Sequence, residues 1–259
     1  MAFSPDYRTY PQASAATTAA VLDAGLRAYM LRVYNWMTSG LVLTGIIAYG
    51  IFNIPSVHEL FYRSGVTASG MVVRDQPTAL AMISVFAPLA FVLVLSMGVN
   101  RLSRSAAQAL YWAFCAAMGA SLTSIFVIYT SESIVRVFFI TAATFAATSI
   151  YGYTTKADLT RMGSFMMMGL FGIIIASLVN IFMASSALQF AISIIGVVVF
   201  TGLTAYDTQR IKATYVQYAY AEGPEGAAKR SVYDALSLYL NFINLFMLLL
   251  QLLGNRNNS

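Results

Sequence analysis

The chain has 259 residues, of which 59% are hydrophobic and only 10% are charged, with a formal net charge of +5. Soluble domains are about 45–50% apolar and about 25% charged, so this composition and a mean hydropathy of +0.71 exclude an ordinary soluble protein. A single cysteine, Cys115, and a single histidine, His58, exclude a disulfide framework and make metal sites or catalysis built on Cys or His hard to assemble.

Residues 1–32 come before the first long apolar run and lack the apolar centre of a signal peptide. We predict that they form a cytoplasmic tail. Within it, the segment Leu22–Arg32 has the pattern of an amphipathic helix that leads into the first membrane span.

Long apolar runs fill most of the remaining chain, and a membrane-spanning helix needs about 20 such residues. The run over residues 162–206 is too long for one crossing, and we divide it at Ala184–Ala187, small residues suited to a tight turn. The sequence therefore predicts seven helices, near residues 33–54, 79–99, 106–129, 137–154, 163–183, 187–207 and 235–253.

These helices predict an all-α polytopic membrane protein, with one transmembrane domain over residues 33–254 and a short C-terminal tail over 255–259. The longest loops are expected at 55–78 and 208–234. His58 falls in the first of them, where we expect a solvated position.

Basic residues are distributed unevenly between the two sides of the predicted domain. With a cytoplasmic N-terminus, all but four of the 15 Lys and Arg residues lie on the inner side, which follows the positive-inside rule. The net positive charge therefore requires no nucleic-acid partner. Seven crossings place Gly254–Ser259 outside, whereas a re-entrant last segment would return this tail to the cytoplasm. The four outer basic residues are Arg63, Arg74, Arg136 and Arg256.

Motifs of enzyme chemistry are missing from the sequence. It contains no phosphate-binding loop, no dinucleotide fingerprint and no HExxH. We therefore predict a protein that is not an enzyme and has no cofactor.

Ionisable residues at membrane depth are costly, which makes them candidates for function. Asp207 ends a charge-free run at the inner end of the sixth predicted span. It is either a functional carboxylate or a solvated helix end screened by Arg210 or Lys212. Arg101 follows the second span at a similar depth and could pair with it, although Arg104 is equally well placed.

Polar residues also open the last span. Asp234 and Asn241 are seven residues apart, so a helix places them on one face with Asn241 about 10 Å deeper. They either form a site or make hydrogen bonds between helices. On the outer side, Glu132 is a possible mouth residue that attracts cations, and the alternative is a solvated loop carboxylate.

Four segments resemble the Bax inhibitor-1 (transmembrane Bax inhibitor motif) family, particularly its proteobacterial inner-membrane members. The resemblance extends over residues 30–254. It is most specific in Ala146–Lys156, Gly163–Asn180, Phe200–Lys212 and Ala235–Phe246.

This resemblance implies a fold in which six helices surround the most C-terminal one, a pH-sensitive calcium leak, and in eukaryotic members a cytoprotective role in stress. It also implies that Asp207 is the carboxylate that senses pH and binds calcium, and that Arg101 latches onto it. The family has a second Asp in the last helix, where this chain has Asn241 after Leu238-Tyr239-Leu240. An Asp–Asn pair lacks the repulsion between two carboxylates, so we expect weak pH dependence near neutrality.

We therefore predict a multi-pass protein of the bacterial inner membrane that acts as a slow, gated calcium leak, with Asp207, Asn241 and Asp234 in its site. The alternative is a membrane scaffold that conducts nothing and modulates other membrane proteins, such as a membrane-bound ATP-dependent protease. A calcium-flux measurement that tests dependence on Asp207 distinguishes the two.

Overall fold

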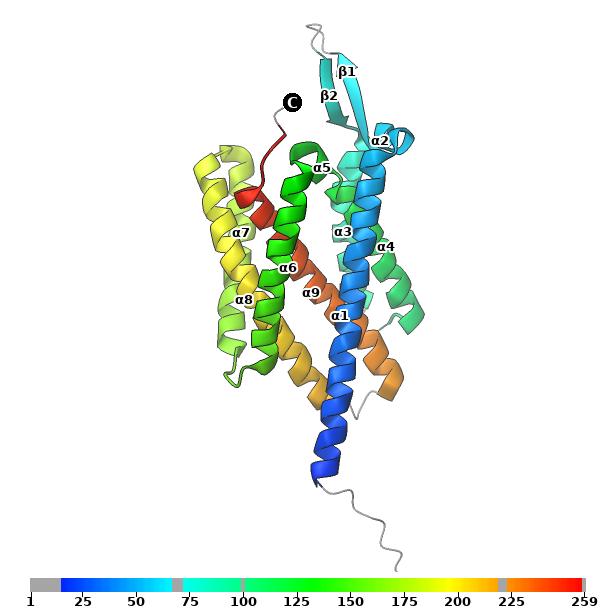
Figure 1. Cartoon of the computed structure of the whole chain (residues 1–259), viewed down its shortest axis with the longest axis vertical. Helices are drawn as coiled ribbons and strands as arrows, with labels where there is room; N and C mark the ends of the chain where they lie inside the picture. Colours follow the sequence, from blue (N-terminus) through cyan, green and yellow to red (C-terminus); the bar gives the residue numbers. More distant parts are fainter. Residues whose placement is uncertain (1–14, 67–71, 99–100, 219–222, 258–259) are drawn as a thin grey trace, which may run out of the picture.

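The computed structural model describes residues 15–66, 72–98, 101–218 and 223–257, and long helices dominate it (Figure 1). The helices run roughly along one axis, and a small β-hairpin projects from one end. The elements are α1 (Ala15–Asn53), α2 (Pro55–Phe61), β1 (Tyr62–Val66), β2 (Val72–Pro77), α3 (Ala79–Gly98), α4 (Arg104–Leu122), α5 (Ser124–Ile128), α6 (Ser131–Thr154), α7 (Thr160–Met183), α8 (Ser186–Tyr218) and α9 (Gly223–Leu253).

Seven candidate membrane spans are present among the described residues, which confirms the predicted all-α polytopic fold. The spans are α1, α3, α4 together with α5, α6, α7, α8 and α9. The predicted turn after the fifth span is also confirmed. Ala184 has a left-handed φ of 49° and ends α7, and the side chain of Asn180 accepts a hydrogen bond from the amide of Ser185.

The loop predicted at residues 208–234 is wrong. Helix α8 continues to Tyr218 and α9 already begins at Gly223, so most of this segment is helical. Charged residues such as Arg210, Lys212 and Lys229 lie within these helices, outside the apolar runs. A charge in the sequence therefore ends the apolar run without ending the helix.

The first span likewise begins earlier than predicted, because α1 is continuous from Ala15 and takes in the second half of the predicted tail. The predicted amphipathic segment Leu22–Arg32 is thus part of the first helix. The third predicted span is broken near its end. Thr123 is fully buried between α4 and α5, and its hydroxyl donates to the carbonyl of Gly119.

The predicted loop at residues 55–78 contains the short helix α2 and the antiparallel pair β1–β2. Its His58 is not solvated as expected, since only 19% of the side chain is exposed. The His58 ring stacks on Tyr62, with centroids 5.3 Å apart, and meets Phe52 edge-on. Its Nε2 lies 3.8 Å from a carboxylate oxygen of Asp75.

The last helix, α9, crosses the bundle diagonally and packs against α1, α4, α6 and α8 (Figure 1). It is the most deeply buried of the candidate spans, with 56% of its apolar stretch buried inside the protein. Helix α3 packs mainly on α4, and helix α7 packs mainly on α8. That six helices surround α9 stays a prediction, and four of the six are its main neighbours.

Close packing between α6 and α8 depends on Gly152. A Cβ atom at this position would collide with the backbone of Ala205 on α8. Small residues allow helix backbones to approach each other in this way inside a membrane. The contact places the C-terminal half of α8, which carries Asp207, directly against α6.

The chain leaves the bundle at the end opposite to the start of α1 (Figure 1). Arg256 pairs with Tyr129 in a β-bridge, and Asn257 donates from its backbone amide to the carbonyl of Ile128. The side chain of Asn257 also approaches three carbonyls in the segment that includes α5 and Tyr129. Helix α9 therefore runs the full length of the bundle, which contradicts the re-entrant alternative.

Candidate functional site: a buried carboxylate between two helices

Asp207 lies on the face of α8 that packs against α9, and 7% of the residue is exposed. The Nδ2 atom of Asn241 donates to its Oδ2 atom over 2.8 Å. The hydroxyl of Ser237 donates to the same oxygen over 3.1 Å. Ser237 and Asn241 are four residues apart on α9, so one face of that helix supplies both donors. The Asp207–Asn241 pair that the family resemblance implies is thus formed, through a hydrogen bond.

The positive partner of Asp207 is Arg210, one turn further along α8. Its Nη2 atom lies 2.9 Å from Oδ1 of Asp207 and 3.2 Å from the hydroxyl of Ser237. The arginine side chain is 45% exposed and the aspartate side chain 10%. A buried carboxylate is therefore neutralised by a cation that reaches in from the polar end of the helix. We call Asp207, Arg210, Ser237 and Asn241 the Asp207 cluster.

The predicted pair between Asp207 and Arg101 is not formed in this structure. Arg101 is exposed in the connection between α3 and α4, and within the described part of the chain it makes no ion pair. Arg210 is three residues from Asp207 on the same helix, so it reaches the carboxylate without any movement of another element. The structure thus has the screening by Arg210 that the sequence left open.

Asp234 lies on the same face of α9, seven residues before Asn241, but has a different partner. The hydroxyl of Tyr29 on α1 donates to its Oδ2 atom over 2.5 Å. Asp207, Arg210 and Arg230 are close enough to act on it electrostatically. Asp234 therefore extends the Asp207 cluster towards the start of α1 as a second carboxylate on the same face of α9.

A row of hydroxyl groups lies beside the cluster and links α1, α6 and α8. The hydroxyl of Tyr34 is 2.5 Å from that of Ser149, which in turn is 2.9 Å from the hydroxyl of Thr208. Thr208 donates to the carbonyl of Thr204. Ser149, Thr204 and Thr208 are buried, so these hydrogen bonds satisfy polar groups that water does not reach.

Glu132 is far from this cluster. It is exposed in the first turn of α6, which the side chain of Thr130 caps. A carboxylate at this position interacts favourably with the helix dipole, and this gives Glu132 a structural role independent of ions. Its predicted role as a mouth residue for cations stays a prediction.

Sequence reasoning missed two members of the site. Ser237 could have been found, because it lies three residues after Asp234 and four before Asn241, on their common helix face. Tyr29 gave no signal, since its contact with Asp234 joins residues 205 positions apart in the chain.

The cluster places oxygen atoms from two helices around the guanidinium of Arg210. Carboxylate, hydroxyl and amide oxygens are the ligands that Ca²⁺ takes in proteins. In the present arrangement, Arg210 occupies Oδ1 of Asp207 and the two donors from α9 occupy Oδ2. The described residues contain no group of three or more Asp, Glu, His or Cys that could hold a metal. A bound cation would have to displace the guanidinium.

Comparison with known proteins agrees with this architecture. The family model described as "Inhibitor of apoptosis-promoting Bax1" matches residues 26–258. An uncharacterised protein of Caulobacter vibrioides is 46% identical over 90% of each chain, and one of Rickettsia prowazekii is 45% identical over 91% of this chain and 93% of its own. The inner membrane protein YbhL of Escherichia coli is 43% identical over 90% of this chain and 94% of its own. The chain therefore belongs to the Bax inhibitor-1 family.

Proposed function

We propose that this chain is a multi-pass protein of the bacterial inner membrane, with its N-terminus in the cytoplasm, that lets Ca²⁺ leak slowly across the bilayer. The observation that carries the proposal is the buried Asp207 carboxylate, which is held between two helices and paired with the partly exposed guanidinium of Arg210. Ionisable residues at membrane depth typically mark ion pathways. The naming of the Escherichia coli relative as an inner membrane protein supports the location.

The gate in this proposal is a competition between Arg210 and a permeant ion for Asp207. While the guanidinium lies 2.9 Å from Oδ1, the carboxylate is neutralised and the pathway is closed. Because the Arg210 side chain is 45% exposed, it can swing out to the polar surface. The oxygens of Asp207, Ser237 and Asn241 then remain as ligands for a hard cation.

Asn241 makes this gate different from one built on two carboxylates. Two acidic groups at this distance would share a proton, and their titration would follow pH near neutrality. Asn241 instead donates its amide N–H to the ionised carboxylate. We therefore propose a leak that is controlled mainly by Arg210 and only weakly by pH around neutrality.

The test is a calcium-flux measurement with purified protein in liposomes that contain a calcium indicator. Wild type should pass Ca²⁺ faster than protein-free liposomes, and Asp207→Asn should abolish the difference. Asp158→Asn is the matched control, because Asp158 is an exposed carboxylate in the α6–α7 connection at the same end of the bundle. Equal flux through wild type and Asp207→Asn would refute the proposal.

A second candidate function is a membrane scaffold that conducts nothing and modulates other proteins, such as a membrane-bound ATP-dependent protease. The observation in its favour is that both oxygens of Asp207 are already engaged within the protein. A wild-type flux equal to that of protein-free liposomes, for protein that is folded by its thermal unfolding curve, would favour the scaffold.

A further inference from the structure

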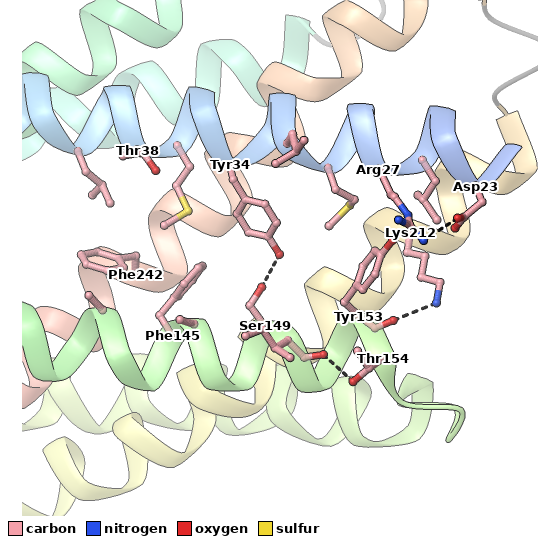
Figure 2. Close-up of a pocket in the computed structure, with 18 of the residues that line it drawn as sticks. Asp23, Arg27, Tyr34, Thr38, Phe145, Ser149, Tyr153, Thr154, Lys212 and Phe242 are labelled. Atoms are coloured by element: carbon pink, nitrogen blue, oxygen red, sulfur yellow. Dashed lines mark hydrogen bonds and ion pairs between the residues drawn. The ribbon is translucent and has the colours of Figure 1, made fainter. Parts of the chain in front are cut away.

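A long groove of about 920 Å³ lies between α1 and α6 (Figure 2). Both helices pack against α8 and α9, and the space between them stays open to the side. Leu31 and Ile150 line the groove and are each 64% exposed. In a protein with seven membrane spans, exposed apolar side chains of this kind face lipid. The groove therefore opens towards the hydrocarbon of the bilayer.

One part of the groove is apolar and extends to α9. It is lined there by aliphatic and aromatic side chains and by Thr38, and Phe242 of α9 contributes to it from behind the two walls. A peptide in this part would leave its backbone N–H and C=O groups without partners, at a cost of several kcal/mol each. A hydrocarbon chain has no such groups. The apolar lining is formed by Met37, Leu41, Phe138, Ala142, Phe145 and Phe242.

The other end of the groove is charged, at the end of the bundle where α1 begins (Figure 2). Arg27 and Asp23 form an ion pair over 2.9 Å and neutralise each other. The Nζ atom of Lys212 donates to the carbonyl of Tyr153 over 2.9 Å and lies 5.0 Å from the centre of its ring. An ammonium group has three donors. Among the charged residues that line the groove, Lys212 thus leaves one net positive charge.

The groove thus has an apolar part and a positively charged end, which complement the hydrocarbon chain and the anionic headgroup of an anionic lipid. We propose that the groove holds one acyl chain of an anionic phospholipid from the surrounding bilayer, with the phosphate beside Lys212 and Arg27. The acyl chain fills the apolar part up to Phe242. The Tyr34–Ser149 hydrogen bond links the two walls of the groove. On the Phe242 side of this bond, the bound acyl chain lies between α1 and α6.

The test uses a phosphatidylglycerol that carries a photoreactive diazirine near the end of one acyl chain, in nanodiscs with the full-length protein. Light should attach the label mainly to residues that line the apolar part, as located by tandem mass spectrometry. Ala146 lines the groove, and Ala146→Trp should block it and strongly reduce this labelling. Ala147→Trp is the matched control, because Ala147 is exposed on the same helix and does not line the groove.

The charged end is tested with the phosphatidylcholine that carries the same photoreactive chain. Wild type should label more strongly with phosphatidylglycerol, and Lys212→Gln should lower that preference by roughly fivefold, the effect of one basic residue near a membrane surface. Lys156→Gln, an exposed lysine outside the groove, should leave the preference unchanged. Thermal unfolding of each variant confirms that it is folded.

Four outcomes would overturn the proposal in whole or in part. Labelling spread evenly over the lipid-facing surface, or unchanged in Ala146→Trp, would mean that the groove binds no acyl chain. Equal labelling by the two lipids would remove the role of Lys212. Photoreactive amino acids can also be placed at groove positions. If they crosslink two copies of the chain and no lipid labelling is seen, the groove binds a second copy of the chain.

Discussion

The Nδ2 atom of Asn241 on α9 lies 2.8 Å from Oδ2 of Asp207 on α8, and both residues are buried. An amide can donate to an ionised carboxylate, whereas a second ionised carboxylate at the same place would repel it. The hydrogen bond therefore joins the two helices without any shared proton. It also fixes one carboxylate oxygen while Arg210 holds the other.

Replacing Asn241 with Asp should make the leak dependent on pH near neutrality. The two carboxylates would then share a proton, and the protonation of the pair would change as pH rises from mildly acidic to mildly alkaline values. Calcium flux measured across that range should be nearly constant for wild type and should rise with pH for Asn241→Asp. A steep wild-type profile that Asp234→Asn abolishes would instead give the role of second carboxylate to Asp234.

Replacing Arg210 with Gln should increase calcium flux, because it removes the cation that neutralises Asp207 in the closed arrangement. Arg101→Gln is the comparison, since Arg101 is exposed and makes no ion pair within the described residues. A double-mutant cycle of Arg210→Gln with Asp207→Asn should show strong non-additivity. An increase caused by Arg101→Gln alone would restore the latch that the family resemblance implies.

Substituting Ala for Gly152 should destabilise the protein, because the added methyl group meets the backbone of Ala205, which cannot move aside as a flexible side chain can. Overpacking of this kind costs about 1–3 kcal/mol. The midpoint of thermal unfolding in detergent should therefore fall. Gly172→Ala on α7 is the matched control, because a Cβ there has nothing within 4 Å. Equal midpoints for the two variants would contradict the close contact between α6 and α8.

Asp158 should stabilise the start of α7 in a pH-dependent way. Hydrogen bonds from the side chain and backbone of Thr160 lower the pKa of Asp158 below its ordinary 3.8, so folding favours the ionised form. This stabilisation is complete above pH 3.8 and is lost as the pH falls through the lowered value. The difference in thermal midpoint between wild type and Asp158→Ala should thus be constant at neutral pH and shrink in acid. A difference that is independent of pH would contradict this.

The membrane orientation is tested by reporter fusions. Fusions after Ser105 and after Thr160 should be cytoplasmic, and a fusion at Ser131 should be periplasmic, because basic residues concentrate at the end where α1 begins. A fusion after Arg256 should also be periplasmic, since the described tail lies beside Tyr129 and Thr130. A periplasmic signal at Thr160 would reverse the orientation.

The spans could be predicted because apolar length is a local property of the sequence. The turn at Ala184 could be predicted for the same reason, because small residues interrupt an apolar run that is too long for one helix. The extensions of α8 and α9 into residues 208–234 could not be predicted from the sequence. Charged residues such as Arg210, Lys229 and Arg230 lie outside the apolar runs, and the length of an apolar run does not show where the helix itself ends.

Side-chain contacts in the site were predicted only in part. The proximity of Asn241 to Asp207 followed from the family resemblance, whereas the choice between Arg101 and Arg210 depended on distances in three dimensions. The groove between α1 and α6 could not be predicted at all. Its width depends on how α1 and α6, which are far apart in the sequence, pack against α8 and α9. The sequence pattern of either helix alone does not determine that arrangement.

The hydrogen bonds of the C-terminal tail give α9 one fixed end. Besides the bridge between Arg256 and Tyr129, the amide of Asn255 donates to the hydroxyl of Ser133 over 2.8 Å. Sliding α9 along its own axis would break these bonds together. Tilting the helix about that anchored end leaves them intact and moves the opposite end most. Such a tilt would carry Ser237 and Asn241 away from Asp207, so the contacts of these two side chains hold α9 at a second point.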